Sequence, residues 1–179
     1  MARRMARTCR VDVDVPAPVE AAWRVVADVT RTGEWSHECH RVEWLDGATS
    51  AVRGARFHGG NKSLWWRWSR TSEVIELEPG RLISWRTIPT WRFVDSTEWR
   101  ITLQPVPIGT RIVQTYQVVR CPRWWEWLAV HANPPHRDRS VALAADVRRI
   151  GDVAVADIAA ANPIGAPHHE CAAADLHPV

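Results

Sequence analysis

The order of strand-like and helix-like segments constrains this chain most: a long series of short alternating strands is followed by one late amphipathic helix. Residues 97–104 show the strand pattern clearly, because Trp99, Ile101 and Leu103 alternate with polar side chains. Alternation with a period of two is typical of a strand that buries one face. Successive strands joined by short turns predict an antiparallel meander, not a set of parallel units.

The same pattern predicts seven strands in all. They are expected at residues 9–15, 41–45, 53–60, 64–77, 81–88, 97–104 and 111–119. Asn61-Lys62 is read as the turn between the third and fourth strands, and Glu78-Pro79-Gly80 as the next turn. Two short helices, at 19–29 and 30–35, are expected after the first strand, the second of them broken at Gly33.

The late helix is expected over residues 138–160, after a short Trp-rich helical segment at 122–130. Its apolar stripe has helical spacing and consists of Leu143, Val147, Ile150, Ala154 and Ile158. The charged residues largely lie off this stripe: Asp146, Arg148, Arg149 and Asp152. Gly151 is a weak point that costs about 1 kcal/mol relative to alanine. The predicted class is α+β: a curved sheet with the helix across its concave face, around an interior that side chains do not fill.

The length of 179 residues suits one domain. We expect a basic N-terminal arm at residues 1–8, the domain at 9–161 and a disordered tail at 162–179, where Pro, Gly, Ala and His follow no period. The four cysteines are scattered and are expected to be reduced.

Composition narrows the partners and the compartment. The apolar runs are too short to span a bilayer, and the basic start is not followed by an apolar signal core, so we expect a cytoplasmic protein without integral membrane contact. The net charge of +3 is mild, and arginines alternate with acidic residues, which argues against nucleic-acid binding. A monomer and a homodimer both remain open.

Several short motifs follow one another in a recognisable order. The relevant stretches are Val15-Pro16-Ala17-Pro18-Val19-Glu20-Ala21-Ala22-Trp23, residues 28–36, residues 54–61, Glu78-Pro79-Gly80-Arg81, Trp99-Arg100, residues 109–112 and residues 135–139. Together they resemble the START-like (SRPBCC) superfamily of polyketide cyclase/dehydrase and lipid-transport proteins, and an actinobacterial branch in particular. The resemblance implies a helix-grip fold over residues 9–160. That scaffold hosts both carriers and enzymes, so it does not by itself assign a function.

The sequence departs from this family pattern at two places. His37 stands where a proline is expected after Trp35-Ser36, and the tryptophans at Trp66 and Trp124-Trp125 are additional. Both departures are expected near the mouth of the cavity, where they would alter the choice of ligand.

An aromatic set with a few polar groups is the best indication of a site. The register of the meander places these side chains on the inner face or beside it: Trp35, Phe57, Asn61, Trp68, Ser72, Trp85, Thr97, Trp99, Gln114 and Tyr116. Apolar walls with a few hydrogen-bonding groups are typical of a ligand pocket. Rings that simply fill the interior are the alternative.

The sequence offers few catalytic groups. Arg56 and His58 fall opposite Phe57 on their strand and are expected at the surface, which leaves Tyr116 and the loop pair His37 and Glu38. Consecutive residues on a strand point to opposite faces, so at most two of residues 37–40 converge, and Cys39 is expected to be inert. We expect no metal and no cofactor, because nucleotide-binding and nucleophile-elbow motifs are missing from the sequence.

Three hypotheses follow. The first is a pocket for a small hydrophobic or aromatic ligand, lipid-like or polyketide-like, which would enter between the late helix and residues 35–40. The second is a cyclase, aromatase or dehydratase that uses Tyr116 or His37 as acid or base. The third is an interaction module in which residues 124–127 dock on a protein or a membrane surface.

Overall fold

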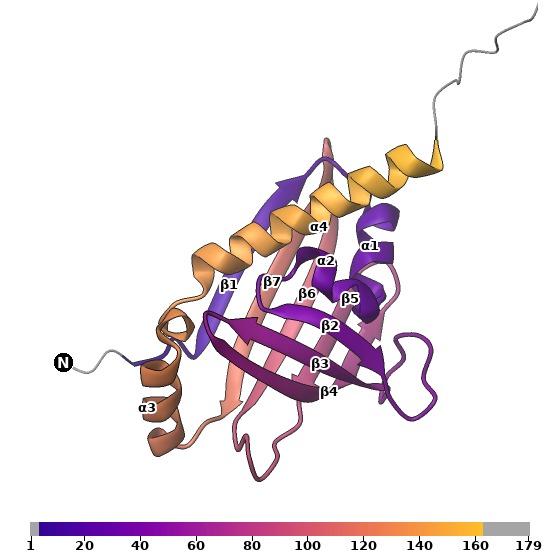
Figure 1. The fold of residues 1–179 in the computed structure, drawn as a ribbon. Helices are drawn as coiled ribbons and strands as arrows, with labels where there is room; N and C mark the ends of the chain where they lie inside the picture. Colours follow the sequence, from indigo (N-terminus) through magenta and orange to yellow (C-terminus); the bar gives the residue numbers. More distant parts are fainter. Residues whose placement is uncertain (1–3, 163–179) are drawn as a thin grey trace, which may run out of the picture.

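The computed structural model describes residues 4–162, and they form one seven-stranded antiparallel sheet with helices packed on one face (Figure 1). The strands are β1 (Thr8–Val15), β2 (Cys39–Trp44), β3 (Arg56–Ser63), β4 (Trp66–Glu78), β5 (Leu82–Thr87), β6 (Ser96–Val106) and β7 (Gly109–Arg120). Their order is β1-β7-β6-β5-β4-β3-β2, so the meander from β2 to β7 is closed at one edge by β1. The predicted α+β class and the seven strands are confirmed.

The helices follow in the expected places. Helix α1 (Val19–Ala27), a 3-10 turn η1 (Val29–Arg31) and α2 (Thr32–Trp35) lie between β1 and β2, while α3 (Arg123–Ala132), η2 (Pro134–Arg137) and α4 (Ser140–Ala161) follow β7. Figure 1 shows α4 lying diagonally across the sheet, beside β1 and α1. Among residues 4–162, no helix is both long enough and apolar enough to cross a bilayer.

The apolar stripe of α4 forms the centre of the core. Its Val147, Ile150 and Ala154 are fully buried against Ile101 and Ile112 of the sheet. Asp146 corrects the expectation that the charged residues of this helix lie off the stripe, because its exposed fraction is only 2%. The spacing explains this: Asp146 lies three residues after Leu143 and so shares its face of the helix.

Two local predictions were wrong. Asn61 and Lys62 do not form a turn but continue β3, where they pair with Trp68 and Arg67 of β4. The turn lies two residues later, at Leu64, whose positive φ of 52° allows the tight reversal. Gly33 does not break its helix either: α2 runs through it, and a Cβ there would lie 2.6 Å from the backbone oxygen of His40.

Gly151 is a contact point between α4 and β1. A Cβ atom at this position would lie 2.6 Å from Cβ of Val15, closer than atoms can approach. The glycine therefore allows the helix to lie directly on the first strand, which compensates for its poor helix propensity.

The residues just before β1, expected to form an arm outside the domain, pack on it. The backbone N–H of Ala6 donates to Arg137 O at 3.0 Å, and Arg7 O accepts from the N–H of Val118 at 2.8 Å. The predicted tail lies almost wholly outside the described residues, as do His168, His169, Glu170 and Cys171.

Candidate functional site

Two adjoining hollows lie between the sheet and the helices. The inner pocket, about 160 Å³, lies beneath α4 and α2, and the outer pocket, about 270 Å³, lies between the sheet and α3. They share five wall residues at their junction: Trp68, Arg70, Asp95, Thr97 and Arg139. The two pockets therefore adjoin one another.

The predicted pocket residues lie together. Nine of the ten line the inner pocket: Trp35, Phe57, Asn61, Trp68, Ser72, Trp85, Thr97, Trp99 and Gln114. Tyr116 lines the outer pocket instead, with Trp68 and Thr97. Their role in binding stays a prediction.

Strand register produces a row of aromatic rings across the sheet. Trp85 of β5 pairs directly with Trp99 of β6, and Trp99 with Tyr116 of β7. The first two rings are stacked, with centroids 6.5 Å apart and planes 11° from parallel, and the centroids of Trp99 and Tyr116 are 5.1 Å apart. Phe57 extends the row at 6.4 Å from Trp85. The near-parallel rings of Trp85 and Trp99 form an apolar wall suited to ring systems, and the rings of Phe57 and Tyr116 are inclined to them by 63° and 48°.

Four residues that line the inner pocket carry a buried polar atom without a hydrogen-bond partner among residues 4–162: Oε1 of Gln114, Nε1 of Trp35, and Nε of Arg70 and of Arg139. The exposed fractions of Gln114 and Trp35 are only 2% and 4%. An unsatisfied buried polar atom costs about 1–3 kcal/mol, so such atoms are normally paired. Gln114 offers an acceptor and Trp35 a donor to a molecule in the pocket.

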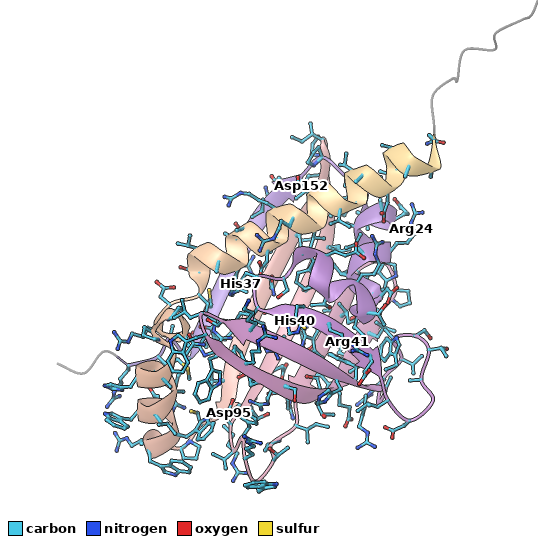
Figure 2. All side chains as sticks on the ribbon, viewed as in Figure 1. Arg24, His37, His40, Arg41, Asp95 and Asp152 are labelled. Atoms are coloured by element: carbon cyan, nitrogen blue, oxygen red, sulfur yellow. The ribbon has the colours of Figure 1, made fainter. Side chains whose placement is uncertain are left out.

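His37 is held at the rim by α4, as Figure 2 shows. Its Nδ1–H donates to Oδ2 of Asp146 at 2.6 Å, and its backbone N–H donates to Oδ1 of Asp146 at 2.9 Å. Burial alone would lower the pKa of His37, but the hydrogen bonds to Asp146 and Glu38 outweigh it and raise this pKa to about 9. The imidazole is therefore charged at neutral pH and could act as an acid rather than as a base.

Glu38 belongs to the same cluster. Burial would raise the pKa of this carboxyl, but Arg139 and the two histidines hold it well below its usual range. Nε2–H of His136 donates to Oε1 of Glu38 at 2.8 Å, and Nη1 of Arg139 lies 3.9 Å from Oε2. Burial lowers the pKa of His136, so this ring is neutral at pH 7 and the charge on Glu38 is balanced by Arg139 and His37.

These contacts bridge the route by which we expected the ligand to enter. Besides the His37 bonds, Nε of Arg149 donates to Trp35 O at 2.8 Å, which ties the loop after α2 to α4. The wider outer pocket lies elsewhere, next to α3.

An ion pair lies at the junction of the two pockets. Nη1 of Arg70 donates to both carboxylate oxygens of Asp95, at 3.0 and 2.9 Å, and Nη2 donates to Asp95 O at 2.8 Å. Arg70 also lies over the ring of Phe93, 5.4 Å from its centroid. Figure 2 places Asp95 near α3, well away from His37. The pair fixes the β5–β6 loop against β4.

Tyr116, one of the catalytic candidates of the sequence, has its hydroxyl engaged by the backbone, and a catalytic role for it stays a prediction. Its hydroxyl donates to Ala6 O at 2.9 Å, and burial raises its pKa. Arg56 and His58 lie away from both pockets: Arg56 pairs with Asp46, and the ring of His58 contacts Thr71. Burial raises the pKa of the Cys39 thiol to about 11, so this thiol is protonated and unreactive.

Sequence reasoning missed the charged groups on the pocket walls. Arg70, Asp95, His136, Arg139 and Asp146 line a pocket but were not predicted to do so. His136 and Arg139 belong to a stretch that carries the family resemblance, and that was the one available signal. Among residues 4–162, no group of three His, Cys, Asp or Glu side chains could hold a metal ion.

A curved antiparallel sheet gripping a long C-terminal helix around a hollow defines a class of ligand-enclosing domains. Residues 6–161 match the family described as polyketide cyclase / dehydrase and lipid transport, and the chain belongs to it. No curated protein matches the chain in sequence.

Solved structures share the fold. The Zhui aromatase/cyclase from Streptomyces sp. R1128 is 20% identical with a TM-score of 0.64, over 87% of this chain and 97% of that one. TTHA0849 from Thermus thermophilus is 16% identical with a TM-score of 0.62, over 84% and 98%. The polyketide-cyclase-like protein Cgl2372 from Corynebacterium glutamicum is 22% identical with a TM-score of 0.55, over 94% and 100%.

Proposed function

We propose that this protein binds a small hydrophobic or aromatic molecule, lipid-like or polyketide-like, in the two adjoining pockets. The observation that carries the proposal is a hollow walled by aromatic rings, with Gln114 and Trp35, each holding one unpartnered polar atom, among its lining residues. A filled core would need neither the hollow nor unpaired polar atoms. We expect the protein to do this in the cytoplasm, as a monomer or homodimer.

The rings and the polar atoms suggest the shape of the ligand. The row from Phe57 to Tyr116 would pack against a flat apolar body, because aromatic rings stack with an offset or meet edge to face. Gln114 and Trp35 would then select for oxygen- or nitrogen-bearing substituents. The Zhui aromatase/cyclase shares this fold at 20% identity, and that level of identity supports a shared fold alone.

Filling the junction between the pockets tests this proposal. Thr97 lines both pockets, whereas Thr102 lies on the same strand with the opposite parity and lines neither. We expect wild-type protein to bind 1-aminoanthracene with a rise in its fluorescence, Thr97→Trp to weaken this binding at least tenfold, and the control Thr102→Trp to retain it. Equal affinities in the two variants, or no binding by the wild type, would refute the pocket.

A second function is favoured by one observation: a charged His37, fixed by Asp146, lines the inner pocket. This imidazolium could protonate an enolate or a leaving hydroxyl, as a cyclase or dehydratase requires. His37→Gln should then abolish turnover of a poly-β-carbonyl thioester while leaving 1-aminoanthracene binding intact. Unchanged turnover would leave binding as the function.

A further inference from the structure

Three segments meet at the end of the molecule opposite α1: the β3–β4 turn, the β5–β6 loop and α3 (Figure 1). A shallow surface groove is lined by Trp66 from the first, Phe93 from the second, and Trp125 and Leu128 from the third. The hydroxyl of Ser63 also donates to Oδ1 of Asn133 at 3.0 Å, which ties the turn to the residue after α3. The three segments therefore form one continuous surface.

The segments that form this surface carry large exposed apolar side chains, which we call the Trp face: Trp65, Trp66, Trp91, Trp124 and Leu128. Trp91 is 90% exposed and Trp65 75%. The prediction for residues 124–127 holds only in part, since Trp124 and Trp127 are exposed while Trp125 turns into the outer pocket and Glu126 is buried against Arg7. Exposed apolar groups gathered at one end of a domain usually mark an interaction site.

The unpaired charges in and around the same segments are all positive. Five exposed basic residues in these segments or beside their ends have no salt-bridge partner among residues 4–162: Arg92 and Arg123 within them, and Lys62, Arg67 and Arg120 on the adjoining strands. The two carboxylates of these segments are already neutralised, Asp95 by Arg70 and Glu126 by Arg7. The Trp face is therefore both apolar and positively charged.

We propose that the Trp face docks on the surface of an anionic lipid bilayer. Tryptophan favours the membrane–water interface, and each basic residue near an anionic surface adds to the attraction. Stable attachment of a peripheral protein takes two such signals, and this face supplies both.

The docking surface goes beyond the proposed function and does not depend on it. Trp66, Trp125 and Leu128 line the outer pocket as well as the surface groove, so the opening of that pocket would face the bilayer. A lipid-soluble ligand could then pass between membrane and pocket without crossing water.

Co-flotation with vesicles tests the proposal. We expect wild-type protein to float with vesicles of phosphatidylcholine containing 30% phosphatidylglycerol at low salt, with a blue shift of its tryptophan emission. Binding to pure phosphatidylcholine should be at least tenfold weaker, and 0.5 M NaCl should weaken the anionic binding. No flotation, or equal flotation with both vesicle types, would overturn the proposal.

The variant Trp91→Ala/Trp124→Ala removes two exposed rings that line neither pocket. We expect it to lower the vesicle partition coefficient about tenfold or more, since each ring would bury apolar area in the interface. The control Ile108→Ala removes an exposed side chain, 77% accessible, from the β6–β7 turn, outside the Trp face. An equal loss in the control, or self-association through the Trp face without vesicle binding, would contradict the proposal. Retained 1-aminoanthracene binding in both variants would show that fold and pocket are intact.

Discussion

Replacing Asp146 with asparagine tests the electrostatic arrangement at the pocket rim. Asp146 accepts hydrogen bonds from the ring and the backbone of His37, and its carboxylate lies on a side chain that is only 2% exposed. The rise in the His37 pKa from 6.5 to about 9 corresponds to about 3 kcal/mol, at 1.36 kcal/mol for each pKa unit. Asparagine keeps the shape but removes the charge, while burial continues to lower the His37 pKa.

We therefore expect the His37 pKa of Asp146→Asn to fall well below that of the wild type, with Glu38 supplying the remaining support. The sign of the pH dependence follows from the direction of the shift. Because the folded-state pKa is raised, the stabilisation by His37 is complete below about pH 6.5 and is lost as the pH rises through 9. Wild-type protein should lose up to about 3 kcal/mol of unfolding free energy across this range, and the variant much less.

NMR titration of the imidazole resonances measures the His37 pKa directly, and the His37→Gln variant assigns the signal. Urea unfolding at pH 6.5 and at pH 9.5 measures the free energy of unfolding. Asp152→Asn is the matched control, because it makes the same change at an exposed position of the same helix. A His37 that still titrates near pH 9 in Asp146→Asn, or that shifts equally in Asp152→Asn, would refute the reasoning.

Two further predictions concern stability. Gly151→Ala should lower the unfolding free energy by about 1–2 kcal/mol despite the better helix propensity of alanine, because its Cβ meets Val15. In a Val15→Ala background the same change should be neutral or stabilising. Denaturant unfolding of the wild type, the two single variants and the double variant measures this, and additive effects would show that the contact is absent. Tyr116→Phe should cost about 1 kcal/mol through the lost bond to Ala6 and leave 1-aminoanthracene binding unchanged; a large loss of binding would instead assign the hydroxyl to the ligand.

Much of the sheet could be predicted from the sequence, because the alternation of buried and exposed side chains along a strand is visible in a few consecutive residues. The alternation of Trp99, Ile101 and Leu103 fixed which face of β6 is buried, and the same parity placed Phe57, Trp85 and Gln114 toward the inner pocket. The β3–β4 turn was misplaced because Asn61 and Lys62 resemble turn residues, whereas Leu64 adopts the left-handed conformation.

The charged walls of the pockets depend on approaches between distant segments, which a periodic pattern does not encode. His37 and Asp146 are 109 residues apart, and Glu38 and His136 are 98 apart. Asp146 in particular was assigned to the polar face of its helix, because its pairing with His37 depends on how α4 crosses the loop after α2. Gly151 could not be explained from the sequence for the same reason, since the need for a glycine follows from its close contact with Val15 in the folded structure.

The charges at the rim also restrict which end of a ligand can lie there. His37, Arg139 and Arg149 are positive, and among residues 4–162 their ion pairs involve two carboxylates, Glu38 and Asp146, so these five groups together carry one net positive charge. Nε of Arg139 lacks a partner among residues 4–162, and its guanidinium lies 5.8 Å above the Trp99 ring, where the two pockets meet. A buried cation with a free donor stabilises an oxygen acceptor or an anion and repels another cation. For the proposed ligand we therefore expect an apolar body against the ring row and an oxygen-bearing end at Arg139.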